Sequence, residues 1–183
     1  PDVVTGWNVR MFDIPYLVNR MQRMLGGDSY KKFSPWNVVR EKQVSMQGRT
    51  QQVYDIVGIE QLDYWDLFQK FGNLTYGVQE SYKLDHIANV VLGEKKLSYE
   101  EHGNLYTLYK EDYQKFIDYN IKDVQLVEKI DEKMGLIDLA MTIAYKGGCN
   151  YQESFGTTQL WDTYIYRELS RQNKVVPTKV NRP

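Results

Sequence analysis

The sequence predicts an α/β domain, and three features of the chain support this fold class. Residues 1–8 read as the end of a buried strand that stops at Gly6, and apolar residues at helical spacing begin soon afterwards. Residues 38–57 alternate polar and apolar side chains on both sides of Gln47-Gly48, which is typical of a hairpin. Several later segments carry apolar residues at the spacing of one helix face.

The composition limits the class of protein before any motif is considered. The chain has 183 residues, of which 42% are hydrophobic, so it can bury the core of one domain. Its formal net charge of -1 gives no overall basic surface of the kind that marks many nucleic-acid-binding proteins. An enzyme that holds metal ions with carboxylates can also be neutral overall, so the charge does not exclude DNA as a partner.

Cysteine, histidine and the start of the chain narrow the class further. The single Cys149 excludes an internal disulfide and suits a reducing compartment, and two histidines argue against a Cys/His zinc site. The sequence has no apolar run long enough for a membrane span and no signal peptide, which predicts a soluble, cytoplasmic protein. Because the chain begins at Pro1 within a strand-like segment, without an initiator Met, we expect a fragment of a longer polypeptide.

The first helix is expected to begin at Ile14 and to end before Gly26. Pro15 suits its first turn, where a missing backbone N–H leaves no hydrogen bond unmade. Residues 28–36 are expected to form a loop. The segment 55–71 reads as a strand followed by a short helix, whose four aromatic residues are expected to pack in the core: Tyr64, Trp65, Phe68 and Phe71.

Three longer helical segments follow. Residues 84–92 form a helix ended by Gly93, and a polar linker is expected from Glu94 to Asp112. A long helix then runs to Gly135, followed by two further helical segments around a Gly-rich connection. The residues of the long helix that are expected to face inward are Ile117, Ile121, Val124 and Ile130.

Two places in this pattern have residues suited to chemistry. Asp13 lies where the first strand gives way to the first helix, so it is either an ordinary N-cap or a catalytic carboxylate. Tyr119 and Asp123 are four residues apart in the long helix, so both project from one side of it, beside the apolar stripe. With fifteen tyrosines in the chain, such a pair also arises by chance.

The order of the motifs resembles the 3′–5′ proofreading exonuclease of family B DNA polymerases, and within it the T-even bacteriophage type. The segments that carry the resemblance cover nearly the whole chain: "GWNVRMFD", "FSP", the hairpin, "LDYWDLFQKF", "YNIKDVQLVEKID" and the later "IDL" and "WD". The resemblance implies a ribonuclease H-like fold, a mixed sheet flanked by helices. That fold would be incomplete at its N-terminus and followed by a helical exit segment.

The resemblance also implies roles for particular residues. Asp13 and Asp123 would hold divalent metal ions, because hard cations prefer oxygen ligands. Two Mg²⁺ or Mn²⁺ ions are expected in the complete domain, where they would stabilise the attacking and leaving oxygens. Tyr119 would orient the attacking water or bind the scissile phosphate, since a phenol with a pKa of about 10 stays protonated at cellular pH. Asn8 and Phe12 would contact the last nucleotides of the primer.

Some parts of that site are absent from the sequence. The family's Asp-x-Glu pair does not occur anywhere in the chain, and the resemblance places it upstream of Pro1. We therefore expect the chain alone to bind metal poorly and to have little or no exonuclease activity. A histidine-type site is not expected, because neither His86 nor His102 precedes Asp123 at the required spacing. The polymerising module would lie downstream of Pro183.

The expected domain organisation follows from the resemblance. Residues 1–135 would form the exonuclease domain, with a hairpin insertion at about 38–57, and residues 136–183 would form a helical segment leading to the polymerase module. In the family, a hairpin at this position keeps primer and template apart. Three basic residues of the hairpin are candidate phosphate contacts: Arg40, Lys42 and Arg49.

The sequence thus predicts a fragment of a replicative DNA-directed DNA polymerase that carries part of its 3′–5′ exonuclease. The expected partners are a DNA primer–template, a single-stranded 3′ end and the remainder of the polymerase chain, with a sliding clamp as a further candidate and no membrane. Two alternatives stay open. One is a free-standing ribonuclease H-like 3′–5′ exonuclease, and the other is a catalytically dead nucleic-acid-binding scaffold.

Overall fold

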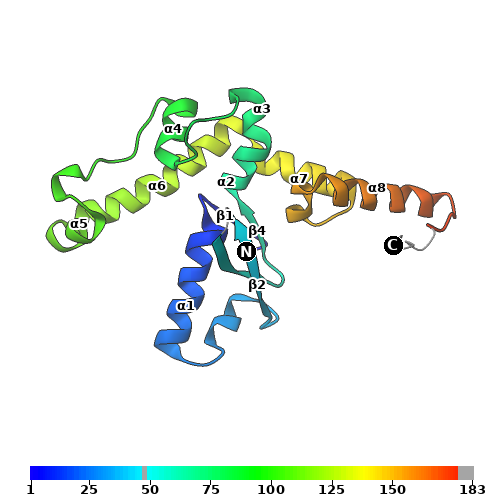
Figure 1. Cartoon of the computed structure of the whole chain (residues 1–183), viewed down its shortest axis with the longest axis horizontal. Coiled ribbons are helices and arrows are strands. Elements are labelled where there is room, and N and C mark those ends of the chain that lie inside the picture. Colours follow the sequence, from blue (N-terminus) through cyan, green and yellow to red (C-terminus); the bar gives the residue numbers. More distant parts are fainter. Residues whose placement is uncertain (47–48, 177–183) are drawn as a thin grey trace. The chain divides into compact units, whose positions relative to one another are not determined.

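The computed structural model describes residues 1–46 and 49–176, except for the side chains at positions 46 and 49. The chain divides into two compact units, Pro1–Leu136 and Ile137–Pro183. Figure 1 shows helices around a few short strands, so the α/β class predicted from the sequence is confirmed. The tip of the predicted hairpin, Gln47-Gly48, lies outside the described residues. No helix in the described part of the chain is long and apolar enough to cross a membrane.

The strands of the first unit form two separate pairs. Strand β1 (Val3–Gly6) runs parallel to β4 (Glu60–Asp63), with Gly6 opposite Asp63 at the end of the ladder. Strands β2 (Val39–Met46) and β3 (Arg49–Ile56) form an antiparallel pair. The single mixed sheet expected from the sequence is therefore not seen among the described residues. A parallel pair and an antiparallel pair stand in its place.

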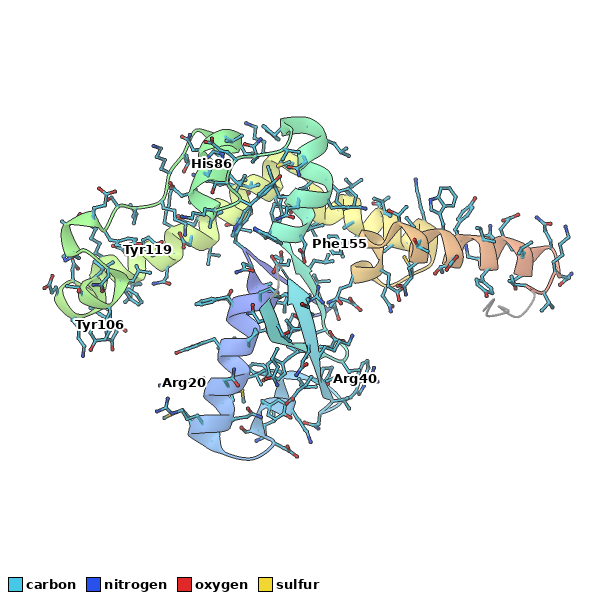
Figure 2. All side chains as sticks on the ribbon, in the orientation of Figure 1. Arg20, Arg40, His86, Tyr106, Tyr119 and Phe155 are labelled. Atoms are coloured by element: carbon cyan, nitrogen blue, oxygen red, sulfur yellow. The ribbon has the colours of Figure 1, made fainter. Side chains whose placement is uncertain are left out.

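The hairpin expected over residues 38–57 is present, but its arms are not polar throughout. Its base carries buried apolar side chains, because it packs against helix α1 (Ile14–Leu25). Figure 2 marks Arg40 on β2, where its register partner is Asp55. Asp55 forms an ion pair with Lys42, so one of the predicted phosphate-binding cations already has an acidic partner. The core cluster shared by the hairpin and α1 consists of Val9, Ile14, Val18, Tyr30, Val39, Tyr54 and Ile56.

The first helix and the loop after it agree with most of the sequence pattern. Helix α1 has Pro15 in its first turn and ends at Gly26, whose φ of 75° is a conformation that favours glycine. The segment expected to be a loop contains one short 3₁₀ turn, Ser29–Phe33. Buried Tyr30 in that turn packs edge-on against Tyr54 of β3, with ring centroids 6.5 Å apart.

An aromatic core lies where β4 meets the next helices. Helix α2 (Tyr64–Leu67), a π-helical turn over Phe68–Gly72 and helix α3 (Asn73–Tyr76) follow one another directly. The Tyr64 and Phe68 side chains are fully buried as expected, whereas Trp65 and Phe71 are half-buried. The Trp7 ring, just after β1, lies 6.3 Å from Tyr64 and 6.2 Å from Phe68, measured between centroids. These contacts tie the end of β1 to α2.

Helix α4 (Leu84–Leu92) packs against the long helix α6 (Tyr113–Met134). Both helices end at glycines in the left-handed region, Gly93 and Gly135, as predicted. The buried residues of α4 are the four expected from its spacing: Leu84, Ile87, Ala88 and Val91.

The buried face of α6 differs from the predicted one. Val124 is 69% exposed and Ile121 is 50% exposed, whereas both were expected to face inward. Ile130 is fully buried as predicted and Ile117 is half-buried, and the buried face also carries Tyr119, Leu126 and Val127. The helix contains two stripes at helical spacing, and only packing decides which is buried. Tyr119 therefore lies on the buried face and not beside it.

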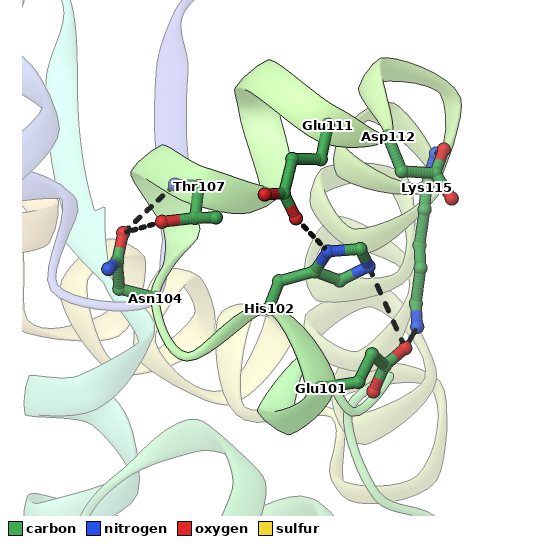
Figure 3. Close-up of polar contacts among 7 residues, drawn as sticks. All are labelled: Glu101, His102, Asn104, Thr107, Glu111, Asp112 and Lys115. Carbon is green, nitrogen blue, oxygen red and sulfur yellow. Dashed lines mark hydrogen bonds and ion pairs between the residues drawn. The ribbon is translucent and has the colours of Figure 1, made fainter.

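The expected polar linker contains structure of its own. A 3₁₀ turn (Glu100–His102) leads into helix α5 (Leu105–Glu111), which begins at the N-cap Asn104. Figure 3 shows the Asn104 side chain accepting from Thr107 and the His102 ring joined to Glu111, with 3.0 Å between Nδ1 and Oε2. Capping residues and ion pairs, which leave no apolar periodicity, explain why the sequence pattern missed this helix.

The second unit is helical, as expected. It comprises most of helix α7 (Leu136–Gly147), a 3₁₀ turn (Tyr151–Phe155) and helix α8 (Thr157–Arg171). A Cβ at Gly147 would overlap the Leu160 side chain, so glycine allows the end of α7 to approach α8 closely.

Candidate functional site

The candidate residues near the N-terminus lie on one unusual turn. After β1, Asn8 adopts a left-handed conformation with φ 65° and ψ 28°. A π-helical turn follows over Val9–Asp13, in which the Ile14 amide donates to the Val9 carbonyl. Asparagine tolerates left-handed backbone better than most residues, and π-helical turns are frequent at functional sites. We refer to residues 8–13 as the Asn8–Asp13 turn.

The Asn8–Asp13 turn is held from two sides. The buried Asp63 carboxylate accepts hydrogen bonds from the backbone amides of Asn8 and Arg10, each at 2.9 Å. From the hairpin, the Gln51 side-chain amide donates to the Met11 carbonyl. The Phe12 ring, directly after these held residues, is 66% exposed. The turn therefore presents an aromatic ring to solvent from a fixed backbone.

Asp13 is not a helix cap in this structure. It directly precedes α1, but its backbone is helical and its side chain makes no capping hydrogen bond. The residue is exposed, although local burial of the carboxyl group raises its pKa above the ordinary value, against a hydrogen bond to its own backbone. The Asp13 side chain therefore does not act as the N-cap of α1 in this structure.

Tyr119 and Asp123 share one side of α6, as their spacing predicts. Both contact the same cation: the Lys96 ammonium lies 2.6 Å from Asp123 Oδ2 and 3.3 Å from the Tyr119 hydroxyl. The ammonium also lies over the Tyr119 ring, 5.3 Å from its centroid. Figure 2 shows the position of Tyr119 on α6. Lys96 was not predicted from the sequence.

Lys96 is placed by contacts on both sides of it. Its own backbone amide donates to Asp85 Oδ1 of α4 at 2.8 Å. Two residues earlier, Glu94 bridges two lysines of α6, with 2.6 Å to Lys122 and 2.7 Å to Lys129. These ion pairs lower the pKa of Glu94 to about 2. The segment that carries Lys96 is thus fastened to α4 and to α6.

The electrostatics of this cluster favour a neutral phenol beside a charged lysine. Burial raises the pKa of Tyr119, and the nearby Lys96 opposes that shift only in part. For Lys96, burial alone would lower the pKa, but the hydrogen bond and charge of Asp123 outweigh it, so the pKa is raised. At neutral pH Tyr119 therefore keeps its proton and can donate or accept a hydrogen bond.

The carboxylates of Asp13 and Asp123 could supply some of the oxygen ligands that a divalent cation needs. Asp123 Oδ1 is buried and has no hydrogen-bond partner among the described residues, which leaves one carboxylate oxygen unused beside Lys96. No hydrogen bond or ion pair of the described residues joins Asp13 to Asp123. Within residues 1–46 and 49–176, no group of three or more His, Cys, Asp or Glu could hold a metal ion. Two carboxylates provide oxygen ligands of the right kind but few of them.

No pattern in the sequence could have identified Lys96. It lies in a polar segment with other lysines, and its contact with Asp123 spans 27 positions. Asp63 was also missed, because its sequence neighbours mark it only as part of an aromatic core. Of the predicted residues, the structure brings Tyr119 and Asp123 together, and it places Asn8, Phe12 and Asp13 on one turn.

Comparison with known proteins supports a single family. The family model for the exonuclease domain of family B DNA polymerases matches residues 1–87, which include the Asn8–Asp13 turn. The resemblance predicted from the sequence is therefore confirmed.

Three viral polymerases are similar to the chain. It is 36% identical over 183 residues to the DNA-directed DNA polymerase of Escherichia phage RB69 and 34% identical over 177 residues to that of Enterobacteria phage T4. These alignments cover 100% and 97% of this chain but only 20% and 19% of the phage proteins. The DNA polymerase catalytic subunit of Psittacid herpesvirus 1 is 32% identical over 139 residues, 73% of this chain and 12% of that protein. The chain spans about a fifth of the length of the phage polymerases.

Proposed function

We propose that this chain, in which residues 1–87 match the exonuclease domain of family B DNA polymerases, carries part of the 3′–5′ proofreading exonuclease of a replicative DNA polymerase. The similarity to two phage polymerases along nearly the whole chain is the observation that carries the proposal. Residues 1–135 would belong to a ribonuclease H-like exonuclease domain. Residues 136–183 would form the helical segment that leads to the polymerising module.

The proposed reaction is hydrolysis of the terminal phosphodiester of a mispaired 3′ end. Water attacks the phosphorus atom, the bond to the 3′ oxygen of the preceding nucleotide breaks, and a nucleoside 5′-monophosphate leaves behind a new 3′ hydroxyl. Both the nucleophile and the phosphate are electron-rich, so positive charge and fixed geometry are the main requirements. When bound, two Mg²⁺ or Mn²⁺ ions would supply that charge.

The proposed roles follow the positions of the side chains. Asp13 is assigned as a metal ligand from the resemblance to the exonuclease family, and its carboxylate is not engaged in capping α1. Asp123 is a metal ligand through Oδ1, the oxygen that Lys96 does not contact. Tyr119 keeps its proton and orients the attacking water. Exposed Phe12 stacks on a base at the primer end, with Asn8 beside it on the same turn.

Lys96 completes the proposed site. In the absence of a divalent ion, its ammonium group neutralises Asp123 and prevents an unpaired, half-buried carboxylate. With DNA bound, the same ammonium group is close enough to Tyr119 to neutralise a phosphate oxygen. A lysine suits both tasks, because its charge is compact and its stem is flexible.

The proposed partners are a DNA primer–template, a single-stranded 3′ end and the remainder of the polymerase chain. A sliding clamp is a further candidate partner, and the proposed location is the cytoplasm, that of the host cell for a phage protein.

The test is hydrolysis of labelled single-stranded DNA with Mg²⁺ by the complete polymerase that contains this segment. Wild type is expected to release nucleotides from the 3′ end, and Asp13→Ala and Asp123→Ala are each expected to abolish release. Asp28→Ala is the matched control and should change nothing, because Asp28 is exposed and forms an ion pair with Lys31. A polymerase that extends primers but shows no exonuclease activity would contradict the proposal.

The chain by itself is expected to hydrolyse DNA poorly, because it contains no Asp-x-Glu pair to complete the ligand set. The same assay on the 183-residue chain tests this directly. Robust hydrolysis that disappears in Asp13→Ala would show that two carboxylates are enough.

A further inference from the structure

Asp63 is a buried acidic residue that the proposed reaction does not use. It is the last residue of β4 and is 2% exposed. Its Oδ1 atom accepts hydrogen bonds from the amides of Asn8 at 2.9 Å and Trp65 at 3.0 Å. Its Oδ2 atom accepts from the amide of Arg10 at 2.9 Å. One carboxylate therefore satisfies three backbone donors on two segments that are more than 50 positions apart.

Only one of these three bonds is needed to begin a helix. The bond from Trp65 is an ordinary N-cap of α2, for which serine or asparagine serves about as well as aspartate. The other two bonds leave the helix and reach the Asn8–Asp13 turn. The residue is thus a cap with a second task, and the second task requires both carboxylate oxygens.

The Asn8–Asp13 turn needs such support because its backbone is not intrinsically favoured. Left-handed Asn8 and the π-helical turn after it are sparsely populated conformations, which persist where the surroundings over-determine them. The turn carries Phe12 and Asp13, whose side chains point away from the core. A shift of about 1 Å at such groups is enough to lower a reaction rate on the order of 100-fold.

We propose that Asp63 is the positioning residue of the exonuclease site: its carboxylate fixes the backbone of Asn8 and Arg10 and thereby sets where Phe12 and Asp13 project. This inference rests on the proposed function. It adds a residue from β4 that touches neither substrate nor metal.

The energetic cost of burying Asp63 supports a role beyond packing. Burial raises the pKa of its carboxyl group to about 6, although the three backbone donors pull the other way. The charged form that accepts all three bonds is therefore less favourable in the folded chain than in the unfolded chain. A residue selected only for stability would be expected to avoid this cost.

Two variants separate the cap from the positioning role. Asp63→Ser keeps a good N-cap for α2 but is too short to reach both donors on the turn. Asp63→Asn keeps the size of the side chain but has one acceptor oxygen, so its amide nitrogen faces the Arg10 or the Asn8 N–H. Asp112→Asn is the matched control, because Asp112 also accepts a backbone amide, that of Lys115, away from the turn.

Two measurements are made on these variants. In the complete polymerase, both Asp63 variants are expected to lower kcat for hydrolysis of saturating single-stranded DNA on the order of tenfold to 100-fold and to raise the Mg²⁺ concentration needed, with primer extension unchanged. In the 183-residue chain, hydrogen exchange of the Arg10 amide is expected to speed up about tenfold, while Trp65 stays protected in Asp63→Ser. Asp112→Asn should change neither the kcat of hydrolysis nor the exchange of the Arg10 amide.

Three other outcomes decide against the inference. If kcat is unchanged although the Arg10 amide exchanges faster, the Asp63 carboxylate orders the turn without contributing to hydrolysis. Reduced kcat with a protected Arg10 amide would mean that Asp63 acts by another route. A wild-type polymerase without exonuclease activity would overturn the proposed function itself and this inference with it. If Asp63→Asn does not fold, Asp63→Ser supplies the same comparison with the helix cap intact.

Discussion

The ammonium group of Lys96 lies 2.6 Å from Oδ2 of Asp123, although the two residues are 27 positions apart in the sequence. The same group lies 3.3 Å from the hydroxyl of Tyr119, so one cation contacts both members of the motif on α6. A site that already holds positive charge against a carboxylate and a phenol is suited to chemistry on phosphate.

The Lys96–Asp123 pair is expected to be coupled energetically. Lys96→Met removes the charge and keeps the stem, which leaves Asp123 half-buried and unpaired. We expect a loss of about 1–2 kcal/mol in the free energy of unfolding. Asp123→Asn in the same background should recover part of that loss, with a coupling energy of about 1 kcal/mol. Urea unfolding of the two single variants and the double variant measures it.

An exposed pair provides the control for that experiment. Lys31 contacts Asp28 at 2.7 Å, but the Asp28 side chain is 73% exposed. The corresponding cycle, Lys31→Met with Asp28→Asn, should give a coupling energy below about 0.5 kcal/mol. Strict additivity at Lys96 and Asp123 would show that their contact contributes nothing to stability.

Asp13 and Asp112 both precede helices, and they are expected to respond differently to alanine. Asp112 accepts the Lys115 amide at 2.9 Å, so Asp112→Ala should lower the free energy of unfolding by about 1 kcal/mol. Asp13 makes no capping bond, so Asp13→Ala should leave stability within about 0.5 kcal/mol of wild type. Thermal unfolding of the two variants makes the comparison. Equal losses would restore the N-cap explanation of Asp13.

The local features of the fold were predictable from the sequence because they depend on neighbouring residues. Glycine and proline positions fixed the ends of α1, and the spacing of Tyr119 and Asp123 placed both on one side of α6. The hairpin followed from its alternation. Each of these signals lies within a few residues of the structure that it predicts.

The features that were missed depend on contacts between distant segments. Which stripe of α6 is buried depends on α4, and so Ile121 and Val124 were wrongly expected to face inward. The contact of Lys96 with Asp123 and that of Asp63 with Asn8 leave no periodic trace in the sequence. Charged residues in polar segments or in aromatic cores are identified as site residues only when the fold brings their partners near.

The raised pKa of Asp63 predicts a particular dependence of stability on pH. Burial raises this pKa to about 6, whereas the ordinary value of an aspartate in an unfolded chain is about 3.9. Between these values the folded chain binds more protons than the unfolded chain, so the contribution is fully present below about pH 4 and is lost as pH rises through about 6. The free energy of unfolding of wild type, relative to Asp63→Asn, should fall on the order of 2 kcal/mol across this window.

Measuring the difference between wild type and Asp63→Asn cancels the titrating groups that do not interact with Asp63, such as Asp13 and Glu94. The nearby charge of Asp66 contributes to the raised pKa of Asp63, so the difference reports on Asp63 together with this interaction. Urea unfolding at several pH values between 4 and 7 supplies the curve. A difference that is independent of pH, or that grows with pH, would show that the pKa of Asp63 is not raised.

Tyr119→Phe is expected to separate the chemistry of the site from its packing. The ring would keep its edge-on contact with Tyr99, 5.4 Å between centroids, so the free energy of unfolding should change by less than about 1 kcal/mol. The lost hydroxyl would no longer orient water, and exonuclease kcat of the complete polymerase should fall by about tenfold or more. Tyr106→Phe is the matched control, because that tyrosine is 71% exposed on α5 and should affect neither quantity.

Since burial holds the pKa of Tyr119 above its ordinary value, the wild-type rate should show no step from its ionisation between pH 7 and about 9. A variant with full activity would contradict the role of the hydroxyl group, and a rate step in that range that is missing in Tyr119→Phe would identify Tyr119 as a base.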